Sequence, residues 1–275
     1  MSVYDYAVPP ILQLEPTTAC NLNCPFCLRS SLNRSEEFIS FEVFRKIIDA
    51  SKSRFLTLHG WGEPLLHADL PEMISYASGK KMSVNFTTNA TLLPGRTDEL
   101  LNAGLDAIAF SFPDSHMFRP IIEKNVSRFI RERSARNQKS PKTYLNIALI
   151  EGNAGCIEEG LGLARATGVD AVNFERSFPW NDGQTKSEKD LFAYIKTAAK
   201  KTGCRVTLPV VHSRPCPLFR LTLFVRWNGD VAPCCYRADL SLGNLLVDNL
   251  ATILKNRRVF QKKMNLDPVC RTCRV

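Results

Sequence analysis

Long apolar runs are missing from this sequence, and so is any feature of an export signal. No stretch of eighteen apolar residues occurs, which excludes a membrane-spanning helix of ordinary length. Residues 1–10 have neither a basic segment nor an apolar core of the kind that a secretory signal contains. We therefore expect a soluble, cytoplasmic protein with no membrane partner.

Histidine is also scarce, whereas cysteine is plentiful. The four histidines share no common spacing, so each is expected to be structural rather than a metal ligand. Ten cysteines without an export signal favour a reducing compartment, where clustered cysteines bind metal more often than they form disulfides. At 275 residues and 44% hydrophobic content, the chain is long enough for one large α/β domain and a small appendage.

The net charge of +9 allows two interpretations. It could indicate a nucleic-acid or phosphate-bearing partner. The basic residues, however, are spread through segments of helical character at 128–136, 196–201 and 255–263, and no compact basic patch is interleaved with aromatic residues. We favour solvated helix faces over a nucleic-acid partner.

A triplet of cysteines, Cys20, Cys24 and Cys27, follows an apolar, strand-like run. A structural zinc site needs four ligands, and disulfides need an even number of cysteines. A [4Fe–4S] cluster held by three thiolates instead keeps one iron open for chemistry. We interpret the triplet as the ligands of such a cluster; the alternatives are half of a zinc knuckle or three buried thiols.

Short apolar runs alternate along the chain with longer segments of helical period, which predicts βα units and a parallel sheet. The predicted strands are 11–15, 55–59, 83–87, 107–112, 144–150 and 171–175. The predicted helices are 40–51, 69–78, 96–103, 117–136, 154–167 and 187–202. Six units give an α/β fold, a partial (β/α)6 TIM-like barrel, whose chemistry should lie in the loops after the strands.

The triplet carries a family resemblance. The spacing of the three cysteines, with the aromatic Phe26 directly before the third, resembles the motif of the radical SAM superfamily. The resemblance covers about residues 11–203 and implies the same six-unit barrel. It also implies that S-adenosylmethionine (SAM) is cleaved to a 5′-deoxyadenosyl radical, with an electron from a reductant such as flavodoxin or ferredoxin.

The second predicted loop contains Gly60, Trp61, Gly62, Glu63 and Pro64. Its glycines allow close approach of the backbone to a ligand, and the carboxylate can bind an amine. Taken alone, the loop is an ordinary Gly/Pro turn. It resembles the family motif that binds the methionyl amino group of SAM, which gives that role to the two glycines, the glutamate and the proline, although Trp61 replaces the usual central glycine.

Polar residues also follow later strands. Thr88 and Asn89 end the third strand and Ser111 ends the fourth. Such residues usually form turns, but their family counterparts bind the ribose and methionyl carboxylate of SAM. Arg176 lies at the end of the sixth strand, where it could contact a substrate hydroxyl or simply pair with an acid.

A second group of cysteines comprises Cys216, Cys234, Cys235, Cys270 and Cys273. These cysteines lie around a predicted hairpin, whose strands are 221–227 and 231–234 and whose turn is 228–230. A predicted helix follows over 248–264. Four soft ligands, two of them in a pair spaced by two residues, define one metal site. Spacing alone leaves the metal open between a zinc ribbon and an iron–sulfur cluster.

The order of Cys216, Gly229, Cys234 and the final cysteine pair resembles the shortened SPASM arrangement called a Twitch domain. The resemblance implies one auxiliary [4Fe–4S] cluster, fully ligated by Cys216, Cys234, Cys270 and Cys273 and suited to electron transfer. We expect no second auxiliary cluster, because no further cysteines follow. Residues 1–205 are assigned to the barrel and 206–275 to a small α+β metal-cluster domain.

The leading hypothesis is a two-electron oxidation of a small polyhydroxylated or amino-sugar-like substrate, similar to the aminocyclitol dehydrogenases, with Arg176 contacting the substrate hydroxyl. One rival is modification of a peptide or protein. Another is epimerisation with Cys235 as hydrogen donor, although this cysteine could also substitute for Cys234 or be an inert thiol. A rival of a different class is a zinc-containing nucleic-acid-binding protein.

Overall fold

The computed structural model describes residues 8–25, 27–32, 34–112, 119–149, 155–176, 185–209 and 216–273. They form two compact units. The first contains the described residues up to Phe86, Asn102–Leu105, and the chain from 216 to Arg271. The second contains Thr87–Leu101, the described residues from Asp106 to 209, and Thr272 and Cys273.

The strands of the first unit are β1 (Ile11–Leu14), β2 (Phe55–Leu58), β3 (Ser83–Thr88), β8 (Thr222–Val225) and β9 (Val231–Ala232). β1 is parallel to β2 on one side and to β8 on the other, so that Leu12 pairs with both Leu56 and Leu223. β2 is also parallel to β3, and β9 forms an antiparallel hairpin with β8. The hairpin therefore extends the parallel sheet through β1.

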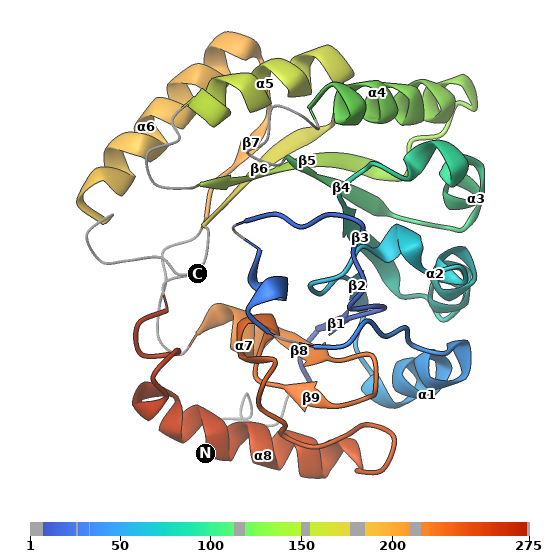
Figure 1. The fold of residues 1–275 in the computed structure, drawn as a ribbon, viewed down its shortest axis with the longest axis vertical. Coiled ribbons are helices and arrows are strands. Elements are labelled where there is room, and N and C mark those ends of the chain that lie inside the picture. The colour runs from blue at the N-terminus through green and yellow to red at the C-terminus, as the bar shows by residue number, and fades with distance from the viewer. Residues whose placement is uncertain are drawn as a thin grey trace. The chain divides into compact units, whose positions relative to one another are not determined.

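The helices of this unit are α1 (Phe41–Ser51), α2 (Leu70–Gly79), α7 (Pro217–Leu221) and α8 (Leu250–Lys263). Local chemistry determines where the long ones begin. The Ser40 hydroxyl accepts the backbone N–H of Val43 before α1, and the Asn249 side chain accepts that of Thr252 before α8. In Figure 1, α1 and α2 lie along the strands from β1 to β3.

The second unit contains β4 (Ala107–Phe112), β5 (Lys142–Leu149), β6 (Ala171–Arg176) and β7 (Val206–Thr207), paired in that order and all parallel. Its helices α4 (Arg119–Ala135), α5 (Gly155–Thr167) and α6 (Thr185–Thr202) cover one face of these strands (Figure 1), and most of α3 (Thr97–Asn102) also belongs to it. Ile108, Phe110 and Phe112 are buried, whereas Ala109 and Ser111 alternate with them on a less covered face.

The predicted α/β fold with six βα units is confirmed. Each predicted strand and helix is present, with ends that agree to within two residues, and the predicted hairpin and final helix are present as β8, β9 and α8. The two-residue strand β7 and the five-residue helix α7 were not predicted. No helix in the described ranges is both long and apolar enough to cross a membrane.

Candidate active site

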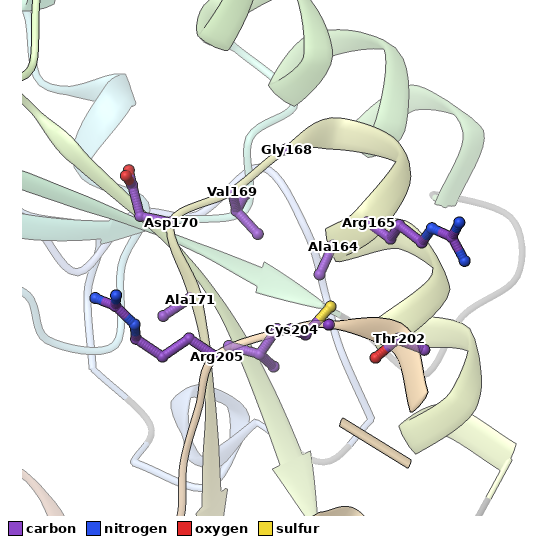
Figure 2. Close-up of a pocket in the computed structure, with 11 residues that line it drawn as sticks. Ala164, Arg165, Gly168, Val169, Asp170, Ala171, Thr202, Cys204 and Arg205 are labelled. Carbon is purple, nitrogen blue, oxygen red and sulfur yellow. The ribbon is translucent and has the colours of Figure 1, made fainter. Parts of the chain in front are cut away.

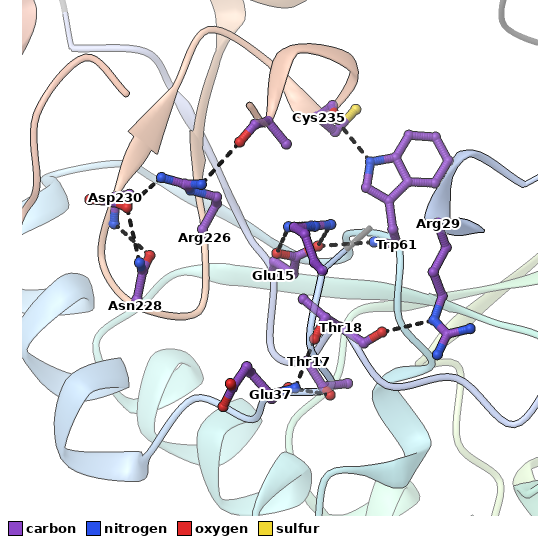
Figure 3. A network of polar contacts seen from close by, with 12 residues as sticks. Glu15, Thr17, Thr18, Arg29, Glu37, Trp61, Arg226, Asn228, Asp230 and Cys235 are labelled. Carbon is purple, nitrogen blue, oxygen red and sulfur yellow. Dashed lines mark hydrogen bonds and ion pairs between the residues drawn. The ribbon is translucent and has the colours of Figure 1, made fainter. Parts of the chain in front are cut away.

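The three cysteines of the first motif lie in a loop that follows β1, and the two ends of this loop are bonded together (Figure 3). The hydroxyl of Thr17 donates to the carbonyl of Glu37 at 2.7 Å, and the hydroxyl of Thr18 donates to the carbonyl of Ser35 at 2.7 Å. The Ile39 N–H donates to the Pro16 carbonyl at 2.9 Å. These hydrogen bonds close the loop at its base.

The thiols of this loop influence one another. Burial, and to a lesser extent the nearby Glu63 and Cys27, raises the pKa of Cys20, against the effect of an N–H···S bond from Leu22 at 3.5 Å. Burial and the other two thiols raise the pKa of Cys24. Three mutually repelling, partly buried thiolates suit a group that supplies positive iron, so these residues fit a [4Fe–4S] cluster.

A site for one metal ion is a different arrangement. Among the residues that the structure describes, no three His, Cys, Asp or Glu side chains gather closely enough to hold a single ion. Each thiolate of a cluster binds a different iron, so the triplet does not need to converge on one point.

The second predicted loop packs directly against the first. A Cβ atom at Gly62 would lie only 2.2 Å from the Thr17 carbonyl oxygen, and the Glu63 N–H donates to the Ala19 carbonyl at 2.8 Å. The Glu63 side chain is buried, and its Oε1 accepts the Leu65 N–H at 3.0 Å in the turn that begins at Pro64. A buried carboxylate is therefore fixed beside Cys20.

Sequence reasoning missed the residue that supports both loops. Glu15 is 0% exposed, and its two carboxylate oxygens accept bonds from Arg34 at 2.8 and 3.0 Å. Its Oε1 also accepts the Trp61 N–H at 3.2 Å, and a Cβ at Gly60 would meet its side chain at 2.5 Å. An acidic residue at the end of a buried apolar strand was the available signal.

The cysteines of the second motif lie around the β8–β9 hairpin. Cys216 is the N-cap residue of α7, and Cys234 follows β9. Burial, and to a lesser extent the thiols of Cys235 and Cys216, raises the pKa of Cys234. Cys216 and Cys234 lie on segments that flank the same hairpin.

Cys270 is held by its own turn. Its N–H donates to Asp267 Oδ1 at 2.9 Å, and Asp267 Oδ2 pairs with Arg237 at 3.0 Å. Because Arg237 ends the short turn that begins at Cys235, this ion pair ties the Cys270 turn to the segment that follows Cys234. Cys273 is half-buried.

Cys235 contacts the loop of the first site. The Trp61 indole N–H donates to its carbonyl at 2.9 Å (Figure 3). The Trp61 ring also meets the Tyr236 ring edge-on, with 5.6 Å between the ring centres. Burial raises the pKa of the Cys235 thiol to about 12, although a hydrogen bond with Gln13 lowers it. The thiol therefore stays protonated at neutral pH.

The remaining predicted residues for SAM and substrate belong to the second unit or lie outside the described residues, as Phe26 does. Thr88 is 1% exposed, and its hydroxyl accepts the Ala90 N–H at 3.0 Å. The Asn89 side chain accepts the N–H of Thr91 at 3.0 Å. Ser111 lies on the less covered face of β4.

Arg176 ends β6, with a side chain that is only 4% exposed. Its Nε pairs with Glu188 of α6 at 2.6 Å. On the less covered face of the neighbouring strands, Asn173 donates to Asn146 at 3.1 Å. These two asparagines were also missed, although polar residues inside apolar strands are a recognisable signal.

Figure 2 shows a pocket of about 340 Å³ in the second unit. Its lining includes Gly168, Asp170 and Ala171, at the start of β6, and Cys204, after α6. The active sites of barrels of this kind lie at the opposite, carboxyl ends of the strands. The pocket is therefore not part of the candidate active site.

Comparison with known families and proteins adds to this geometry. Residues 14–149 match the radical SAM superfamily, and residues 216–274 match the iron–sulfur cluster-binding domain called SPASM. A tungsten-containing aldehyde ferredoxin oxidoreductase cofactor-modifying protein of Pyrococcus furiosus is 24% identical in an alignment 310 positions long, which covers 95% of this chain and 86% of that protein.

Two solved structures are similar in fold. SuiB of Streptococcus suis, bound to its precursor peptide SuiA, has a TM-score of 0.72 at 15% identity and covers 91% of this chain, which spans 66% of SuiB. BtrN, in complex with AdoMet and 2-DOIA, has a TM-score of 0.57 at 14% identity over 96% of this chain and 92% of BtrN. At these identities the likeness shows the fold alone.

Proposed function

We propose that this chain, which contains a radical SAM domain and a SPASM domain, is a radical SAM enzyme that oxidises a small polyhydroxylated or amino-sugar-like substrate by two electrons. The radical SAM domain binds SAM and a [4Fe–4S] cluster, and the SPASM domain binds auxiliary iron–sulfur clusters. When bound, these groups supply a 5′-deoxyadenosyl radical that takes a substrate hydrogen, together with an acceptor for the second electron.

The residues that hold the first cluster and SAM are assigned from the geometry of the first unit. Cys20, Cys24 and Cys27 would hold the cluster, because they are the three thiols of a loop whose base is already closed. Glu63 would bind the amine of SAM, because its carboxylate is buried and its backbone is bonded to Ala19, next to Cys20.

One observation carries the proposal of oxidation. The Trp61 indole donates to the carbonyl of Cys235 at 2.9 Å, which connects the loop of Glu63 to the residue next to Cys234. The cysteines Cys216, Cys234 and Cys270 belong to the same compact unit as the first motif. A Twitch-type auxiliary cluster on these cysteines would be anchored to the SAM loop, as an electron acceptor needs.

Arg176 remains our candidate for the residue that contacts the substrate hydroxyl. It lies at the carboxyl end of β6, but on the buried face of that strand and paired with Glu188, so contact with a substrate requires the guanidinium to turn away from this pair. A guanidinium can orient a hydroxyl. The oxidation removes a hydrogen atom and then an electron from the carbon, and a proton from that hydroxyl.

The first test is the iron and acid-labile sulfide content per chain after anaerobic reconstitution, with zinc measured on untreated protein. Two clusters require about eight irons. The Cys24→Ala variant should lose SAM cleavage, whereas Cys270→Ala/Cys273→Ala should retain cleavage and lose net oxidation of the substrate. About four irons with one zinc, or unchanged oxidation by the double variant, would refute the acceptor role.

Epimerisation is the second candidate, and the state of Cys235 favours it. A protonated thiol can give a hydrogen atom to a carbon radical, after which the resulting sulfur radical needs one electron and one proton from the external reductant. Solvent deuterium should then enter the product, and Cys235→Ala should abolish that incorporation. Product without solvent deuterium would eliminate this candidate.

Peptide modification is the remaining alternative; SuiB, which is similar to this chain in fold alone, is a protein that binds a precursor peptide. The match of residues 216–274 to an iron–sulfur domain favours a cluster over the zinc of a nucleic-acid-binding protein. SAM cleavage that accelerates with a polyol but not with peptides would separate the small-molecule proposal from the peptide alternative.

A further inference from the structure

Arg257 of α8 is an unusual buried cation. It is 4% exposed, and its guanidinium carbon lies 4.2 Å from the centre of the Phe219 ring. Its Nη2 donates to the carbonyl of Phe219 and, at 3.0 Å, to that of Thr222. Its Nη1 is buried and has no hydrogen-bond partner among the described residues.

No carboxylate in the described ranges lies within 4.0 Å of this guanidinium. A buried charge without a counter-charge is unfavourable, and so is a buried donor that makes no hydrogen bond. The two carbonyls therefore account for Nη2, but neither the charge nor Nη1 is compensated within the part of the chain that the structure describes.

The position of Arg257 indicates what compensates it. Phe219 lies in α7, the helix that Cys216 caps, and Thr222 begins the hairpin that leads to Cys234. The guanidinium is also near enough to the Cys234 side chain for the charge of one to affect the other. The uncompensated cation thus lies beside two of the four cysteines proposed for the auxiliary site.

We infer that Arg257 belongs to the auxiliary site, where its Nη1 donates to a sulfur of the cluster and its charge raises the reduction potential. This inference rests on the proposed function, which gives the auxiliary cluster its cysteines. A [4Fe–4S] cluster with four thiolates is an anion, and reduction adds one more negative charge. A buried cation and an N–H···S bond both favour the reduced form, as an electron acceptor requires.

The test isolates the auxiliary cluster in full-length protein that carries Cys20→Ala, Cys24→Ala and Cys27→Ala. Its potential is measured by redox titration followed by EPR. Arg257→Gln removes the charge but retains a donor for the Phe219 carbonyl, and Arg257→Lys retains the charge. Lys255→Gln removes one exposed charge from the same helix and serves as the matched control.

Arg257→Gln should lower the equilibrium constant for one-electron reduction of the cluster at least tenfold, which corresponds to a fall of about 59 mV in its reduction potential. Lys255→Gln should leave the potential unchanged, and Arg257→Lys should shift it by less than half as much as Arg257→Gln. A normal cluster at the wild-type potential in Arg257→Gln would overturn the inference, and would leave the proposed oxidation standing.

A second measurement covers the case in which Arg257→Gln fails to hold a cluster. In the same three-cysteine background, protein labelled with ¹⁵N-arginine should show a nitrogen coupling to the reduced cluster that Arg257→Lys lacks. No coupling would overturn the inference. An isolated auxiliary site that contains no iron would refute the proposed function itself, which is a distinct result.

Discussion

The substitution Gly62→Ala tests the contact between the two loops of the first site. The new Cβ would lie 2.2 Å from the Thr17 oxygen and 2.7 Å from the Ala19 oxygen, and both are backbone atoms that cannot rotate away. Reaching 3.0 Å, the shortest distance that Cβ atoms tolerate, requires a movement of about 0.8 Å. The Glu63 N–H would then lose its 2.8 Å bond to Ala19.

The cost follows from these two effects. Overpacking costs about 1–3 kcal/mol, and a buried donor without its acceptor costs about 1–3 kcal/mol more. If about 2 kcal/mol of this cost destabilises the conformation that binds SAM, the affinity for SAM should drop at least about tenfold, because each ~1.4 kcal/mol corresponds to a factor of ten. Equilibrium dialysis with the reconstituted protein measures the dissociation constant, and thermal unfolding measures the stability.

Gly162→Ala is the matched control. Gly162 is exposed inside α5, and a Cβ there meets nothing within 4 Å. Alanine should stabilise this helix by about 0.5–1 kcal/mol and leave SAM binding unchanged. If Gly62→Ala bound SAM within twofold of wild type and melted at the same temperature, the packing argument would be refuted.

Three further predictions concern the first unit. Arg34→Leu leaves the Glu15 carboxylate buried without its partner and should cost about 3–5 kcal/mol in chemical denaturation, most of which Glu15→Leu/Arg34→Leu should restore. Trp61→Phe loses the bond to the Cys235 carbonyl, so a chelator should remove auxiliary iron faster than from wild type; equal rates would contradict this. Burial lowers the pKa of His59 from 6.5 to about 4, so the unfolded chain takes up the proton first as pH falls below 6.5. His59→Phe should therefore lose about 2 kcal/mol less of its free energy of unfolding than wild type between pH 7 and pH 5, as urea titrations can measure.

The strands and helices could be predicted because their signals are local. Alternating apolar runs and capping residues such as Ser40 and Asn249 determine where elements begin. The parallel pairing of β8 with β1 could not be predicted, because no local pattern in Thr222–Val225 specifies a partner near the start of the chain. Very short elements such as β7 lack a period long enough to recognise.

The candidate site divides in the same way. The cysteines and Glu63 could be selected from the sequence because few other residue types can bind iron or an amine. Glu15 and Arg257 could not, because their roles depend on contacts with residues that are distant in the sequence. Thr88 illustrates the limit of a motif. The two-residue alternation of β3 places its side chain on the buried face and that of Thr87 on the other, so its place in a SAM site remains a prediction.

The pairing of β1 with β8 has a consequence for biosynthesis. Ile11 and Thr222 are about 210 residues apart, so a nascent chain emerging from the ribosome completes α1 and β2 long before β8 exists. Until then one edge of β1 has unpaired N–H and C=O groups, which invite aberrant strand pairing. The anchor of Trp61 on Cys235 also forms only at that late stage. The surroundings of the first motif are thus complete only after the hairpin has been made and has closed the edge.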